Sequence, residues 1–263
     1  MNPQMPPETQ RAQKSNRIKA FASRRPFLFA LVFFVVSFCL VLVDLFVLPP
    51  LWGDQVVQSL LAFGVLLWLG WLRPAGFNGP SQWRSLSLFW LPGLLALGSL
   101  SAFVLTLQVS SAMVVVLAVL FALLNGLSEE ARFRGVILQG LLPYGWLRAA
   151  ALSALFFGLA HLINLLIYPP LIAFAYVFDG FLFGLGYAAC RLRTNMIWPL
   201  IIFHACRDLI PVATVLNGRT VPALYGSAWF VIASFVFDVL LAGYGLLLLR
   251  PRRQSHLETL AEQ

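Results

Sequence analysis

The chain has 263 residues, of which 60% are hydrophobic and 11% charged, and its mean hydropathy is +0.85. Soluble domains average about 25% charged residues, so the composition excludes an ordinary soluble protein and indicates a polytopic membrane protein. The formal net charge of +8 does not indicate nucleic acid as a partner, because the basic residues are dispersed in short connections without a basic helix or an aromatic platform. The expected surroundings are a lipid bilayer.

Three regions follow one another along the chain. Residues 1–25 are polar and basic and contain three prolines, which discourage an early helix, so we expect a cytosolic tail. Residues 26–250 are expected to form one transmembrane domain, because repeated apolar runs of about 18 to 23 residues can cross about 30 Å of hydrocarbon as helices. Residues 251–263 are expected to form a second cytosolic tail.

The apolar runs predict an all-α bundle of about eight transmembrane helices, separated by proline- and glycine-rich turns. In chain order the expected spans are Phe27–Leu48, Val56–Leu72, Leu86–Leu107, Met113–Gly140, Ala149–Ile167, Leu171–Leu192, Met196–Leu216 and Ala228–Leu249. With the amino terminus inside, all of the 18 lysines and arginines except Arg207 and Arg219 fall on the cytosolic side. The positive-inside rule therefore predicts a multi-pass protein of the inner (cytoplasmic) membrane with both termini in the cytosol.

Several ionisable residues fall inside the expected spans. An unpaired charge in hydrocarbon costs several kcal/mol, so each such residue is a functional-site hypothesis. They are Asp44, Glu129, Glu130, His161, Asp179, His204, Arg207, Asp208 and Asp238. No motif surrounds Asp44 or Asp238, so interhelical pairing is the favoured interpretation for both, whereas the span of Asp179 could line a cavity.

Three of these residues, on three different spans, are expected at similar depth. At about 1.5 Å of rise per residue, Glu129 lies roughly 16 Å, His161 roughly 18 Å and His204 roughly 12 Å from the cytosolic end of its span. The three side chains can therefore converge at one site inside the membrane.

Helical spacing assigns different directions to the two adjacent glutamates. Neighbouring residues on a helix diverge by about 100°, whereas residues four apart share a face. Glu130 and Arg134 are therefore expected to pair, which leaves Glu129 to face the site. His204 and Asp208 share a face in the same way.

A carboxylate and two imidazoles in a low-dielectric cavity are suited to hydrolysis. One group accepts a proton from water, and the others orient the nucleophile or polarise a carbonyl group. The same residue types can also hold zinc with one position open for water, in which case Glu129, His161 and His204 are the expected Zn²⁺ ligands. The spacing does not choose between metal-bound and directly activated water, and the H-E-x-x-H motif is absent.

Three motifs in the chain resemble those of a known family. Glu129-Glu130-x-x-x-Arg134, Phe157-x-x-x-His161 and His204-x-x-x-Asp208 follow one another on successive core helices. In this order they are similar to the signature motifs of the CPBP family of intramembrane proteases. That family comprises type II CAAX prenyl endopeptidases and bacteriocin-processing or immunity proteins, and the similarity covers about residues 113–210.

The resemblance implies a hydrolase, namely a glutamate-dependent endopeptidase or a metalloprotease. Such an enzyme would cut membrane-associated or lipid-anchored peptides or proteins within the membrane. Glu129 and His161 would activate the attacking water, with Glu130 and Arg134 supporting the site. His204 and the residue four positions later would stabilise the oxyanion.

Asp208 departs from the family pattern, which often has Asn at this position. An ionised aspartate cannot donate a hydrogen bond to an oxyanion. The expected alternatives are that Asp208 orients His204, carries a proton, or pairs with Arg207.

Two other functions fit part of the pattern. A non-catalytic immunity or scaffolding member of the family would bind peptides with the same helices, and a Glu129→Ala variant would then keep full function. A proton-coupled transporter would explain intramembrane acids and histidines but not the motif spacings.

Overall fold

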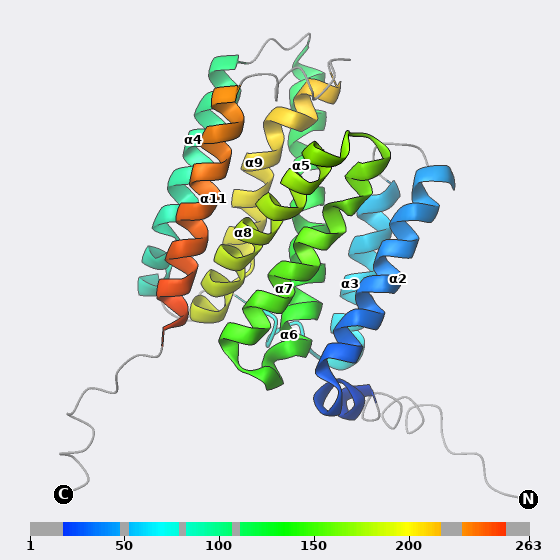
Figure 1. The fold of residues 1–263 in the computed structure, drawn as a ribbon. Helices are drawn as coiled ribbons and strands as arrows, with labels where there is room; N and C mark the ends of the chain where they lie inside the picture. Colours follow the sequence, from blue (N-terminus) through cyan, green and yellow to red (C-terminus); the bar gives the residue numbers. More distant parts are fainter. Residues whose placement is uncertain (1–17, 48–52, 79–82, 107–110, 217–227, 251–263) are drawn as a thin grey trace, which may run out of the picture.

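The computed structural model describes residues 18–47, 53–78, 83–106, 111–216 and 228–250. These ranges exclude most of the two expected tails, and residues 18–24 are helical. Within the described ranges the protein is an all-α bundle without strands, which confirms the predicted fold class. The first helix begins and the last helix ends at the same end of the bundle (Figure 1).

Every predicted span contains one long helix. These helices are α2 (Pro26–Val47), α3 (Gly53–Leu69), α4 (Trp90–Thr106), α5 (Ala112–Glu130), α7 (Trp146–Ala160), α8 (Pro170–Thr194), α9 (Trp198–Leu216) and α11 (Ala228–Leu249). Short segments between them are η1 (Trp83–Phe89), η2 (Ala131–Ile137), α6 (Leu138–Leu141), η3 (Leu142–Tyr144) and η4 (His161–Leu166). Among the described residues, six helical segments are long and apolar enough to cross a membrane, while α3 is shorter at 17 residues.

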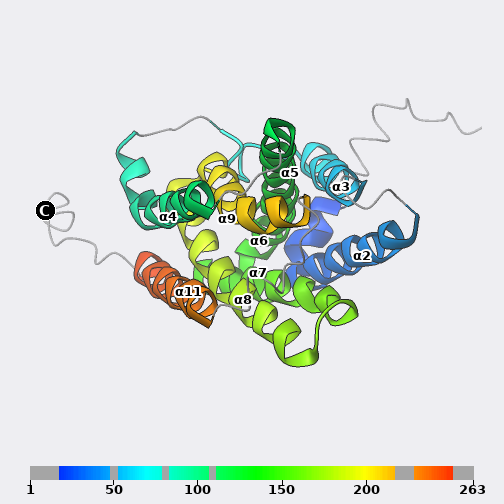
Figure 2. The same cartoon turned by 90° about the horizontal axis from the view of Figure 1, so that it is seen from above.

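The helices surround a core that runs along α8 and α9. Helix α8 packs along α7 and α11, and α9 packs along α4 and α5, while α2 and α3 lie side by side at one edge (Figures 1 and 2). Helices α5 and α9 approach closely at Gly126, where an added Cβ would lie only 2.8 Å from the backbone oxygen of Ile201. This close approach brings the end of α5 against the polar residues of α9.

Two of the predicted spans change helix type next to ionisable residues. After Glu130 the chain passes from α5 into the π-helical segment η2, all of whose residues are buried. Such π-helical turns are rare in proteins, and those that occur are often found at functional sites. Helix α7 likewise gives way at His161 to the 3₁₀ segment η4. Both spans are helical as predicted, but neither is a uniform α-helix.

Three arginines that the sequence places among the cytosolic charges are in fact buried in the bundle. Their exposed fractions are 6% for Arg132, 0% for Arg134 and 3% for Arg191. Arg132 donates hydrogen bonds to Ser37 of α2 and to Gln58 of α3, each at 3.3 Å. These long side chains reach inward because they find polar partners there, so fewer positive charges determine the membrane orientation than the sequence indicates.

Candidate active site

Carboxylates from two helices surround the imidazole of His204. Its Nδ1 lies 2.8 Å from Oε1 of Glu130, and its Nε2 lies 3.4 Å from Oε2 of Glu129. The same Nε2 lies 3.6 Å from Oδ2 of Asp208, one turn further along α9. Because an ionised carboxylate only accepts, Nδ1–H donates to Glu130 and fixes the orientation of the ring. We call Glu129, Glu130, Arg134, His204 and Asp208 the catalytic cluster, after the role that the sequence predicts for them.

Glu130 and Arg134 form the pair that their spacing predicts, with Nη1 of Arg134 3.2 Å from Oε1 of Glu130. Both side chains are fully buried. Beyond this contact, Oε2 of Glu130 and the guanidinium nitrogens have no hydrogen-bond partner among the described residues. The guanidinium lies 4.3 Å over the ring of Phe157, a cation–π contact. A single oxygen, Oε1, therefore serves both His204 and Arg134.

Glu129 diverges from Glu130 and reaches the opposite nitrogen of His204. Its side chain is 19% exposed, whereas that of Glu130 is fully buried. Asn125, one turn earlier, donates from Nδ2 to Oδ2 of Asp208 at 2.8 Å and so joins α5 to α9. Of the three predicted roles for Asp208, pairing with Arg207 is not found, since no ion pair joins these two residues within the described ranges, and the other two roles stay predictions.

His161 lies on another side of the site. Its Nδ1 is 2.9 Å from the backbone oxygen of Phe157, and because a carbonyl oxygen only accepts, Nδ1–H donates. Gly180 of α8 makes room for this ring, because a Cβ there would lie 3.0 Å from Nδ1. In the part of the chain that the structure describes, no carboxylate is within ion-pair distance of His161. His161 is therefore near the catalytic cluster without being bonded to it.

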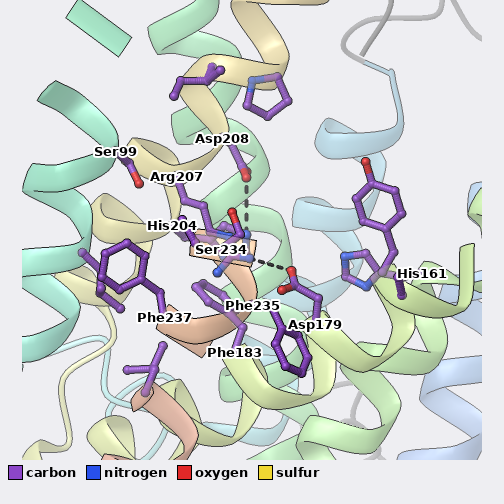
Figure 3. A pocket seen from close by; sticks show the side chains of 18 of the residues that line it. Ser99, His161, Asp179, Phe183, His204, Arg207, Asp208, Ser234, Phe235 and Phe237 are labelled. Atoms are coloured by element: carbon purple, nitrogen blue, oxygen red, sulfur yellow. Dashed lines mark hydrogen bonds and ion pairs between the residues drawn. The ribbon is translucent and has the colours of Figure 1, made fainter. Parts of the chain in front are cut away.

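A cavity of about 630 Å³ connects His161 with His204. Its walls come from α4, α7, η4, α8, α9 and α11, and most of them are aromatic or aliphatic (Figure 3). Apart from three tyrosines, the titratable side chains on these walls are His161, Asp179, His204, Arg207 and Asp208. An apolar cavity of this size with a few polar groups is typical of a ligand-binding site.

The predicted zinc ligands do not form a metal site. Among the described residues, no group of three or more His, Cys, Asp or Glu side chains is arranged to hold a metal ion. The set Glu129, His161 and His204 therefore does not fit Zn²⁺ in this arrangement.

Arg207 belongs to a second charged cluster that helical spacing alone does not predict. Its Nη1 and Nη2 lie 2.5 and 2.7 Å from the two carboxylate oxygens of Asp238 on α11. Nη2 also lies 2.6 Å from Oδ2 of Asp179 on α8. We call Arg207, Asp179 and Asp238 the arginine triad. The expected interhelical partner of Asp238 is thus Arg207, which no spacing within one helix could identify.

The sequence comparisons identify one family. Residues 111–210 match the model of a family described as type II CAAX prenyl endopeptidase Rce1-like. No curated protein and no solved structure matches the chain significantly. The matched segment contains all three motifs, so the resemblance to the CAAX-protease family is confirmed over this part of the chain.

Proposed function

We propose that this protein, which carries the sequence pattern of the CAAX-protease family over residues 111–210, is an intramembrane endopeptidase that uses directly activated water. The observation that carries the proposal is the contact between Glu129 and His204 beside an apolar cavity inside the bundle. A carboxylate and an imidazole in contact can move a proton between water and a leaving group. The buried partners of His204 hold its ring for that role.

The protons can follow one path through the cluster. Glu129 accepts a proton from water, and the lone pair on Nε2 of His161 helps to orient that water across the cavity. The water oxygen attacks the carbonyl carbon of the scissile bond. Glu129 then passes the proton to Nε2 of His204, 3.4 Å away, which delivers it to the leaving amine. Glu130 receives Nδ1–H throughout and stabilises the imidazolium that forms.

The expected substrate is a membrane-associated peptide or protein, including lipid-anchored ones. The aromatic and aliphatic cavity walls support an apolar substrate segment. We place both termini in the cytosol, because Lys19, Arg24 and Arg25 near the start of α2 and Arg250 after α11 are all exposed.

Comparison of cells that carry the wild type or Glu129→Ala tests catalysis and identifies substrates together. Membrane-protein fragments present only with the wild type are expected, and purified Glu129→Ala and His161→Ala should both fail to produce them. Asp44→Asn is the matched control, since Asp44 is a buried intramembrane acid on α2 outside the catalytic cluster. Cleavage by either purified alanine variant would overturn the proposal.

Two further measurements separate the alternatives. Chelators such as 1,10-phenanthroline are expected to leave cleavage unchanged, and a reversible loss restored by zinc would instead support the metalloprotease mechanism. A non-catalytic immunity or scaffolding role would be supported if Glu129→Ala retained full protection or partner binding in cells.

A further inference from the structure

The arginine triad ties three helices together beside the cavity. The fully buried Asp238 takes both terminal nitrogens of Arg207, and Asp179 takes one of them as well. A planar guanidinium bound by both oxygens of one carboxylate is held in orientation as well as in position. Helix α9 is therefore fixed to α8 and α11 at Arg207.

Helix α9 needs such an attachment because its own backbone is interrupted. Pro211 lies inside the helix and has no N–H, so the carbonyl oxygen of Arg207 loses its usual intrahelical partner. Proline inside a helix also bends it. The missing backbone hydrogen bond is at Arg207, three residues after His204. Contacts with other helices therefore help to hold the backbone of α9 near the catalytic cluster.

One aromatic ring lies between the triad and the imidazole. The guanidinium of Arg207 lies 4.7 Å over the ring of Phe183, and the ring of His204 meets Phe183 edge-on at 5.0 Å. Figure 3 shows Arg207, Phe183 and His204 together on the cavity wall. A shift of Arg207 would therefore move the surface against which His204 packs.

We infer that Arg207 is a positioning residue, which through Asp238, Asp179 and Phe183 holds His204 against the two glutamates. The inference rests on the proposed function for its catalytic consequence. Both terminal nitrogens of Arg207 are already engaged by carboxylates, so its geometry suits a tie between helices rather than a site for an anionic substrate group.

The chain offers a direct readout, because it has only three histidines, His161, His204 and His256. Full-length protein labelled with ¹⁵N-histidine in detergent micelles should show ring-nitrogen signals for His204, assigned by their loss in His204→Gln. In Asp238→Asn these ring-nitrogen signals are expected to shift, because the imidazole is no longer held in one position against the two glutamates. Asp44→Asn should leave the signals unchanged. Unchanged His204 signals in a folded Asp238→Asn protein would overturn the inference.

Two milder variants keep the test decisive if Asp238→Asn fails to fold. Asp179→Asn removes the partly exposed contact, and Arg207→Lys keeps the charge but loses the two-oxygen geometry. Both are expected to move the His204 signals in the same direction by a smaller amount. If both leave the signals at their wild-type positions, Arg207 does not position His204.

Kinetics then separates positioning from substrate binding. With a peptide substrate found in the cellular comparison, Asp238→Asn should lower kcat about tenfold or more with little change in KM. Arg207→Lys should retain more activity than Arg207→Leu. Because the nuclear magnetic resonance measurement needs no turnover, failure of the proposed function would leave the inference about His204 separately testable.

Discussion

The two charged clusters share helix α9 but differ in how completely they are paired. In the arginine triad the three nitrogen–oxygen contacts measure 2.5, 2.6 and 2.7 Å. In the catalytic cluster the contacts of His204 measure 2.8, 3.4 and 3.6 Å, and Oε2 of Glu130 has no hydrogen-bond partner among the described residues. One cluster is closely paired within the protein, and the other has longer contacts and a carboxylate oxygen that no described residue binds.

This difference suits the arginine triad to holding helices together and the catalytic cluster to binding a reactant. A closely paired buried cluster has little to gain from a new ligand and resists movement. Unsatisfied buried polar groups are rare in native proteins, and a local concentration of them is a sign of a working site. Under the proposed function, Glu129 and His204 of the catalytic cluster act on water and the scissile bond, whereas the triad stabilises the helix that presents His204.

The largest expected effect comes from Glu129→Gln, which keeps the shape of the side chain but removes the base. We expect kcat to fall by about 10³-fold, within the range of general-base contributions. Because the side chain is 19% exposed, the folded state should tolerate the change. Parallel measurements of cleavage rate and thermal unfolding check this, and retention of a tenth of wild-type activity would be inconsistent with the proposed base.

A second prediction concerns the buried pair of Glu130 and Arg134. Glu130→Gln and Arg134→Met should each destabilise the protein by about 3–5 kcal/mol, because each leaves a buried group without its partner. The double variant should recover much of that loss in the free energy of unfolding, yet stay poorly active because His204 has lost its carboxylate. Strictly additive losses would show that the pair is not coupled.

A third prediction concerns the approach of the two core helices. Gly126→Ala places a Cβ 2.8 Å from the backbone oxygen of Ile201, so α5 and α9 must separate at a cost of about 1–3 kcal/mol. The cleavage rate should fall, because separating these helices also weakens the contact between Glu129 and His204. Gly64→Ala in α3 is the matched control, since nothing lies within 4 Å of its added Cβ. Equal losses of cleavage and stability in Gly126→Ala and Gly64→Ala would show that Gly126 has no special role in the approach of the helices.

The smallest effect is expected for Asp208→Asn. The amide oxygen can still accept from Asn125, and the amide nitrogen adds a donor that the resemblance associates with oxyanion stabilisation. Activity should stay within about threefold of the wild type, which corresponds to less than 1 kcal/mol in the barrier. A hundredfold loss would instead show that the negative charge beside His204 is required.

Sequence reasoning was most successful where one helix determines the geometry. The hydrophobic runs predicted the helices, and i, i+4 spacing predicted the pairing of Glu130 with Arg134. It was less successful for contacts between helices, such as Arg207 with Asp238, because no local spacing encodes them. The burial of Arg132 was missed for the same reason, since its partners belong to α2 and α3.

The π-helical segment η2 also changes the direction in which the following side chains point around the helix axis. A π-helical turn holds about one residue more than an α-helical turn, and one residue corresponds to about 100° of rotation. Upstream of it Glu129 and Glu130 face α9, and downstream Leu138 and Leu141 are fully buried in the core. Deleting a single residue from η2 would rotate the glutamates before it relative to the buried leucines after it. With this extra residue, one continuous helical stretch presents glutamates to α9 and leucines to the apolar core.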